Sequence, residues 1–266
     1  MIRVGNQSAF SASPFTLPFD FALQQGFEAF EWFPDRRTDA ALGWSASDIS
    51  AAQRQEFRTR ARDVGMRLSV HAPIESDPLR VSSHRGLEDS LRLAVDLGAA
   101  VLNIHFSEPH RVEEFARALG PWVDRCGVAG IKLSLENVPG TGPEDFNRLF
   151  ALLPGSRNGV GMCLDIGHAN LHHTTRNDYI GYIDRLRPEV PIVHLHLHEN
   201  HGDRDSHLVL FTGPAGRDPA GLRALLERLA RRGYSGSGIL EQWPDPPSLL
   251  VTARDRLNAL MREVQP

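Results

Sequence analysis

Short apolar runs alternate with longer amphipathic segments from one end of the chain to the other. We count eight such runs, rich in Val, Ile and Leu as buried parallel strands are, at residues 2–7, 27–32, 67–71, 100–105, 131–137, 159–165, 192–198 and 237–241. Eight strand–helix units favour a closed (β/α)8 barrel, the TIM barrel of the α/β class, over an open sheet. No linker or low-complexity tract divides the 266 residues, so we expect one barrel domain over residues 1–266.

The segments between the runs have the apolar spacing of helices. We expect helices at residues 18–25, 47–64, 83–97, 143–152, 177–187, 218–232 and 248–263. Gly65, Gly98 and Gly233 directly follow three of them, which is where glycine commonly ends a helix. Ser47 and Asp48 are the expected N-cap of the second helix, because their side-chain oxygens can accept from free backbone N–H groups.

Charge and composition narrow the class of partner. The chain has 29 basic and 33 acidic residues, a net charge of -4 and a pI near 6.3. Proteins that bind duplex nucleic acid usually present a basic surface, so we do not expect nucleic acid as the main partner. No stretch approaches the roughly 20 apolar residues of a membrane span, and the first residues, MIRVGNQ, lack the apolar centre of a signal peptide. We therefore expect a cytoplasmic protein without a membrane partner.

Side chains that can bind a metal stand at the ends of at least six of the eight runs. They are His71, His105, Glu136, Asp165, His196 and Glu241, with His168, Asp205 and His207 in the segments that follow. A single histidine at a strand end is more often a hydrogen-bonded core residue, but the joint pattern has no structural purpose in an apolar barrel. Barrel enzymes gather catalytic groups at the carboxyl ends of their strands. Carboxylates buried together are costly without cations, so the pattern predicts a divalent-metal site.

The ligand types leave the metal open. Histidine nitrogen and carboxylate oxygen together suit Mn, Mg, Co, Zn or Fe. His194, His196 and His198 alternate along the seventh run, so on a strand they face one side. Positions on the same side rise by about 6.5 Å, so one of the three should reach the metal and a second should orient it or contact substrate. Glu31 in the second run is either a substrate contact or a structural residue.

Six motifs at these positions resemble those of the xylose isomerase-like superfamily of TIM barrels. They are SVHAP at 69–73, NIHFSEP at 103–109, LENVPGTG at 135–142, LDIGHANL at 164–171, HLHLHENHGDRDSHL at 194–208 and ILEQW at 239–243. The superfamily includes sugar-phosphate isomerases and epimerases as well as type IV apurinic endonucleases. The resemblance covers essentially the whole chain and rests on the order and spacing of the motifs.

The isomerase and epimerase branch of this superfamily implies one metal held by four residues. The matching positions are Glu136, Asp165, His196 and Glu241, of which Glu136 and Glu241 would also transfer protons as the catalytic pair. The first strand and the HAP of residues 71–73 resemble this branch. We therefore expect a metal-dependent isomerase or epimerase with a small carbohydrate-like substrate and no cofactor besides the metal.

The endonuclease branch implies an alternative, because nine ligands there hold three zinc ions. The five additional positions are His71, His105, His168, Asp205 and His207, which we expect to bind either substrate or a second metal. An endonuclease-IV-like phosphodiester hydrolase, a dehydratase or lyase, and a multi-metal oxidase therefore stay open. The one lysine, Lys132, lies four residues before Glu136, which is the wrong place for the lysine of true xylose isomerases. Relatives are often dimers or tetramers, so a homo-oligomer is also open.

Overall fold

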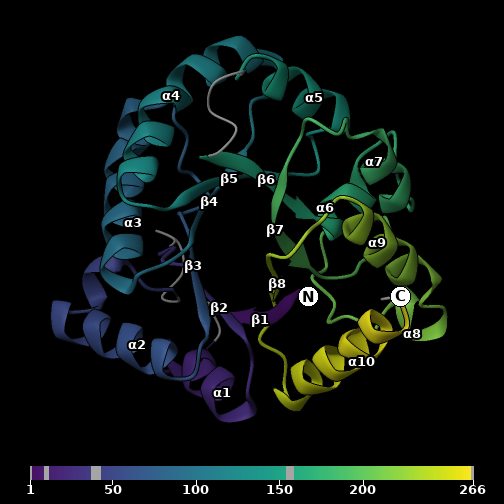
Figure 1. Cartoon of the computed structure of the whole chain (residues 1–266), viewed down its shortest axis with the longest axis horizontal. Helices are drawn as coiled ribbons and strands as arrows, with labels where there is room; N and C mark the ends of the chain where they lie inside the picture. Colours follow the sequence, from purple (N-terminus) through teal and green to yellow (C-terminus); the bar gives the residue numbers. More distant parts are fainter. Residues whose placement is uncertain (1, 9–11, 37–42, 154–158, 265–266) are drawn as a thin grey trace.

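Eight parallel strands close into a barrel in sequence order, with β8 paired to β1 (Figure 1). The computed structural model describes residues 2–8, 12–36, 43–153 and 159–264. The strands are β1 (Arg3–Gln7), β2 (Ala29–Trp32), β3 (Arg67–His71), β4 (Val101–Phe106), β5 (Lys132–Asn137), β6 (Val160–Asp165), β7 (Ile192–Leu197) and β8 (Ser237–Leu240). The TIM barrel expected from the alternating pattern is confirmed.

A ring of helices surrounds the barrel (Figure 1). The longer helices are α1 (Leu17–Gln25), α2 (Ala51–Asp63), α3 (His84–Leu97), α4 (Val112–Val128), α5 (Pro143–Ala151), α7 (Tyr179–Arg185), α9 (Ala220–Arg231) and α10 (Ser248–Val264). Short pieces are α6 (Ile166–Leu171), α8 (Pro214–Arg217) and the 3-10 turns η1 (Ala46–Asp48), η2 (Val81–Ser83) and η3 (Pro109–Arg111). Among the described residues, no helix is both long enough and apolar enough to cross a bilayer.

The second helix begins later than the sequence pattern suggested. Ser50 is the N-cap of α2, since its Oγ accepts from Gln53 N and the Gln53 side chain accepts from Ser50 N. Ser47 and Asp48 belong instead to η1, where Asp48 Oδ2 accepts from Ser45 N. The expected cap at residues 47 and 48 is therefore wrong, because the reciprocal Ser50–Gln53 pair satisfies two helix-terminal groups at once.

The two faces of the barrel wall differ in chemistry. Outward side chains are apolar and pack on the helices, as Phe30 does on Phe19 of α1 and Phe106 does on Phe115 of α4. Inward side chains include a polar set that is bonded between the neighbouring strands β4 and β5, where Ser134 donates to Asn103 and Asn103 donates to Glu136. Such pairing is necessary because an unsatisfied buried polar group is costly. The polar interior continues up to the carboxyl ends of the strands.

Candidate metal centre

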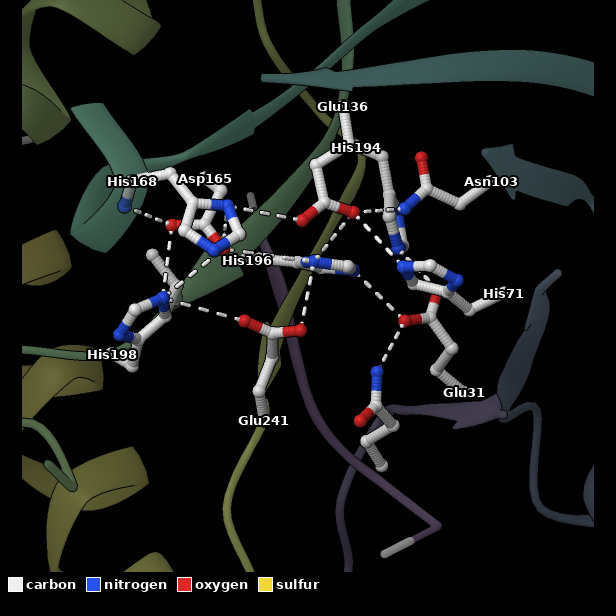
Figure 2. A network of polar contacts seen from close by, with 12 residues as sticks. Glu31, His71, Asn103, Glu136, Asp165, His168, His194, His196, His198 and Glu241 are labelled. Carbon is white, nitrogen blue, oxygen red and sulfur yellow. Dashed lines mark hydrogen bonds and ion pairs between the residues drawn. The ribbon is translucent and has the colours of Figure 1, made fainter. Parts of the chain in front are cut away.

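The nine residues singled out by the sequence gather at the carboxyl ends of the strands. His71 ends β3, Asp165 ends β6 and Glu241 directly follows β8. The others lie in β4, β5, β7, α6 and the segment after β7: His105, Glu136, His196, His168, Asp205 and His207. A parallel barrel brings all of its carboxyl ends to one rim, which is why residues so distant in sequence meet (Figure 2).

The quartet of Glu136, Asp165, His196 and Glu241 forms the centre of this rim. Each residue offers one ligand atom, and the four atoms lie within 4.8 Å of one another. His196 Nδ1 is 3.0 Å from Glu241 Oε1, 3.2 Å from Glu136 Oε2 and 4.0 Å from Asp165 Oδ2. The structure thus brings together the four positions that the resemblance to the isomerase branch assigned to one metal.

Two buried atoms of the quartet have no hydrogen-bond partner within the described part of the chain. They are His196 Nδ1 and Glu241 Oε2. Buried polar atoms nearly always have a hydrogen-bond partner or another ligand. These two atoms lie among the carboxylates of the quartet without a hydrogen bond to any described residue, so they indicate that a further group binds there. Three carboxylate oxygens and one imidazole nitrogen suit a divalent cation, which would also offset their charge. The residues present therefore fit the group that the superfamily implies.

Glu136 is a buried carboxylate of the quartet with several polar neighbours. Asn103 donates to its Oε2, and His71 Nε2 lies 3.1 Å from the same oxygen. Burial raises the pKa of a carboxyl, but the charges of His196 and His105 outweigh that effect and hold the pKa of Glu136 well below its usual value. Glu136 is therefore an ionised ligand with little freedom to move.

A second cluster of possible ligands adjoins the quartet. His168 Nε2 and His207 Nε2 lie 3.1 Å and 3.0 Å from Asp205 Oδ2, and His198 Nδ1 lies 3.8 Å from Asp205 Oδ1. The four ligand atoms lie within 4.8 Å of one another. Burial lowers the pKa of His207, but Asp205 and Glu241 outweigh it and raise that pKa to about 9. A third such group consists of His71, His105 and Glu136.

His198 links the quartet to the second cluster, a role that the sequence analysis missed. Its Nε2 is 3.0 Å from Asp165 Oδ1, and its ring stacks on His207 with centroids 4.1 Å apart. The ring fits because residue 167 is glycine: a Cβ there would lie 1.9 Å from His198 Cε1. The only sequence signal was the alternation of three histidines, which did not show which neighbours the last of them meets.

Glu31, His194 and Cys163 also point into the barrel and lie deeper in it than the quartet. Glu31 is completely buried, and both of its oxygens are bonded to protein donors. Of the two roles left open for Glu31, its burial favours the structural one, because no face of its carboxylate reaches solvent. His194 lies beside it, and Cys163 also points inward, with its thiol near Glu136 and His196.

Exposure increases from the centre of the rim towards the loop after β7. Glu136, Asp165 and His196 are buried, the Glu241 side chain is 8% exposed, and the Asp205 and His207 side chains are 35% and 40% exposed. The quartet is therefore nearest to solvent on the side of Glu241 and His207. Glu199 holds this loop in place, because its carboxylate accepts from the backbone N–H groups of Phe211, Gly213 and Ala215.

Solved structures with a similar fold include an epimerase-like protein and an endonuclease. A D-tagatose 3-epimerase-like protein superposes with a TM-score of 0.75 at 21% identity over 99% of this chain and 98% of that chain. Endonuclease IV from Thermus thermophilus gives 0.67 at 23% identity over 98% and 99%. At these identities the two likenesses show the fold alone. Another Thermus thermophilus protein, in a structure soaked with zinc chloride, gives 0.68 at 26% identity over 100% of both chains.

Sequence comparison shows the family. An uncharacterised protein of Methanocaldococcus jannaschii is 32% identical over 197 residues, which cover 71% of this chain. The match spans 59% of the length of that relative and 64% of a second curated relative from the same organism. The model of the family described as xylose isomerase-like TIM barrel matches residues 19–261, which is most of the chain. The protein therefore belongs to the xylose isomerase-like TIM barrel family.

Proposed function

We propose that this protein is a divalent-metal-dependent isomerase or epimerase of a small sugar or sugar phosphate. The observation that carries the proposal is the approach of two glutamates, Glu136 and Glu241, to the unpaired Nδ1 of His196. This arrangement puts a cation site and two proton-carrying groups within one small volume.

The quartet would hold the cation through Glu136, Asp165, His196 and Glu241. When bound, a divalent cation polarises a carbonyl or hydroxyl oxygen of the substrate and so acidifies the neighbouring C–H bond. His105 and His168 stand beside Glu136, at 3.6 Å and 3.4 Å from its Oε1. Both nitrogens of His168 are bonded, to Asn137 O and to Asp205 Oδ2, so we expect the ring of His105 to hydrogen-bond to a further oxygen of a polyol and to orient the substrate chain.

Glu241 is the better placed proton acceptor. Its Oε2 lacks a hydrogen-bond partner among the described residues, whereas Glu136 is held by Asn103 and His71. Glu241 takes the proton from the carbon next to the carbonyl, and the electron pair of the broken C–H bond forms a carbon–carbon double bond while the carbonyl electron pair moves onto oxygen. For the isomer, Glu241 returns the proton to the former carbonyl carbon, the proton of the neighbouring hydroxyl moves to the other oxygen, and Glu241 is ionised again. For the epimer, the same carbon is protonated on its opposite face: Glu136, which is ionised at rest, takes up the proton for this step from solvent, and Glu241 releases its proton to solvent.

The test is proton exchange with solvent. The purified protein, loaded in turn with Mn²⁺, Co²⁺, Mg²⁺ or Zn²⁺, is incubated with ketose sugars and their phosphates in D2O, and deuterium at carbon is followed by NMR. The proposal expects deuterium incorporation together with a new isomer or epimer. Loss of water instead would assign a dehydratase or lyase, and no exchange with any ketose at full metal occupancy would contradict the proposal.

A second candidate function is a multi-metal phosphodiester hydrolase of the endonuclease IV type. It is favoured by the two further ligand groups, one around Asp205 and one consisting of His71, His105 and Glu136. Clustered cations can stabilise both the attacking and the leaving oxygen of a phosphodiester. This candidate expects two or three metals per chain, their partial loss in Asp205→Asn, and cleavage of an abasic-site duplex. One metal per chain with an intact duplex would exclude it.

A further inference from the structure

Below the quartet, the carboxylate of Glu31 is bonded on both oxygens. Oε1 accepts from Gln7 Nε2 at 2.9 Å and faces His196 Nε2 at 2.8 Å. Oε2 accepts from Ser69 Oγ at 2.8 Å and faces His194 Nε2 at 2.8 Å. All five side chains of this network belong to β1, β2, β3 and β7 and point into the barrel. A carboxylate surrounded in this way has acceptor capacity only, so each facing imidazole nitrogen must carry a proton.

This pairing determines which nitrogen of His196 faces the quartet. With the proton on Nε2, the lone pair of a neutral imidazole is on Nδ1. Nδ1 is the atom that lies 3.0 Å from Glu241 and 3.2 Å from Glu136 without a hydrogen bond of its own. Figure 2 shows the ring of His196 between Glu31 and the carboxylates of Glu136 and Glu241.

We propose that Glu31 is a positioning residue that fixes the orientation and tautomer of His196, so that His196 binds the cation through Nδ1. The inference rests on the metal site of the proposed function. Carboxylates that accept from the second nitrogen of a metal-bound histidine orient the ring and raise its basicity. Because Glu31 is buried beneath His196, it acts on the cation only through that ring.

His194 has a separate part in the same network. It shares Glu31 with His196, and its own Nδ1 has no hydrogen-bond partner among the described residues. His194 does not belong to the quartet, so its part is to keep Glu31 in place and not to bind the cation. Glu28→Gln, at an exposed position just before β2 and outside this network, is a matched control.

The first measurement is cation affinity, obtained by competition with a chromophoric chelator for Zn²⁺ and Mn²⁺. We compare the wild-type chain with Glu31→Gln, Glu31→Leu and Glu28→Gln. Glu31→Leu removes every acceptor and should weaken binding by about 100-fold, and Glu31→Gln, which keeps one acceptor without the charge, by about 10-fold. Glu28→Gln should bind like the wild type.

The second measurement is the ¹⁵N NMR spectrum of the histidine side chains in the zinc-loaded wild-type protein, which requires no variant to fold. It should show His196 bound through Nδ1, with a slowly exchanging proton on Nε2. His194→Asn assigns the neighbouring signal. In any Glu31 variant that folds, the Nε2 proton of His196 should lose its downfield shift, an effect that a general loss of stability would not produce.

The outcomes separate this inference from the proposed function. Graded loss of affinity together with binding through Nδ1 supports Glu31 as the positioning residue. Equal affinity in all four proteins, or His196 bound through Nε2, overturns the inference and leaves the metal site in place. A wild-type chain that binds no divalent cation overturns the proposed function and the inference together.

Discussion

At the scale of single residues, freedom of movement distinguishes the two glutamates of the quartet. Glu136 is bonded to Asn103 and His71 and lies near three further imidazoles, so it is fixed. The Glu241 side chain is 8% exposed, and its Oε2 has no hydrogen-bond partner in the described chain, although His198 and His207 lie 3.6 Å and 3.9 Å from it. A group that abstracts a proton needs a lone pair that no hydrogen bond occupies, which Glu241 Oε2 offers.

Substitution of Glu241 by Gln should therefore lower turnover by at least about 100-fold while the fold persists. The amide has nearly the same shape but cannot accept the proton. Deuterium incorporation measures turnover, and circular dichroism checks the fold. Glu227→Gln, at a half-buried position on α9 outside the quartet, serves as the control. A Glu241→Gln protein as active as the wild type would remove Glu241 from the proton-transfer step.

Gly167 gives a steric prediction. An added Cβ would lie 1.9 Å from His198 Cε1, so Gly167→Ala should displace the ring and destabilise the fold by about 1–3 kcal/mol. Gly120→Ala in α4 is the matched control, because its Cβ would meet nothing within 4 Å and alanine favours helices. Urea unfolding of the two variants gives the comparison. Equal free energies of unfolding would show that His198 is not packed against Gly167.

The residues of the quartet could be found from the sequence because each stands at or near the end of an apolar run. Asp165 ends one strand and Glu241 directly follows another, and the resemblance to the isomerase branch supplied the grouping. The roles of Glu31 and His198 could not be found in that way. These roles depend on which side chains meet inside the barrel. Those contacts are set by the register between strands and by how deep each side chain lies in the barrel, and the sequence of a single strand does not encode either.

At the scale of elements, the segment of residues 199–217 connects the site to solvent. It carries Asp205 and His207 of the second cluster. Its far end is anchored to Glu199, whose carboxylate accepts three backbone N–H groups. The sequence did not reveal this anchor, because one glutamate among several polar residues has no distinctive pattern. It also did not single out α4, where Gly120 and Pro121 interrupt the helical signal.

Glu199→Ala should loosen this loop. The substitution leaves three backbone donors without their acceptor, at a cost of about 1–3 kcal/mol for each donor that stays buried and unpaired. Trypsin should then cleave faster after the exposed Arg204, as followed by mass spectrometry. Glu189→Gln, at an exposed position before β7, should cleave like the wild type. Unchanged cleavage after Arg204 in Glu199→Ala would show that the anchor does not hold the loop.

At the scale of the whole molecule, the two ends of the barrel have different roles. The candidate ligands lie at the carboxyl rim, whereas Lys132 is exposed at the amino end of β5. Lys132 is therefore at the opposite end of the barrel from Glu136, as its position in the sequence suggested. The chain concentrates its buried charge at one rim, so the stability of the whole barrel should depend on what neutralises that rim.

Metal removal should accordingly destabilise the protein. At a free cation concentration about 100 times the dissociation constant, binding to the native state alone adds about 2.7 kcal/mol to the free energy of unfolding. Thermal unfolding with and without a chelator should show a higher midpoint for the loaded protein. Asp165→Asn, which removes one carboxylate of the quartet, should reduce this difference. The same midpoint in both conditions would mean that no cation binds the folded rim.

The most direct test of the account is the metal content of the wild-type chain, determined by elemental analysis after purification without chelator or added metal, and again after reconstitution. The account predicts at least one divalent ion per chain, lost in Asp165→Asn. One ion of Mn, Co, Mg or Fe would favour the isomerase or epimerase, and two or three ions of Zn or Fe would favour hydrolase or oxidase chemistry. A chain that holds no metal in either preparation would contradict the central claim.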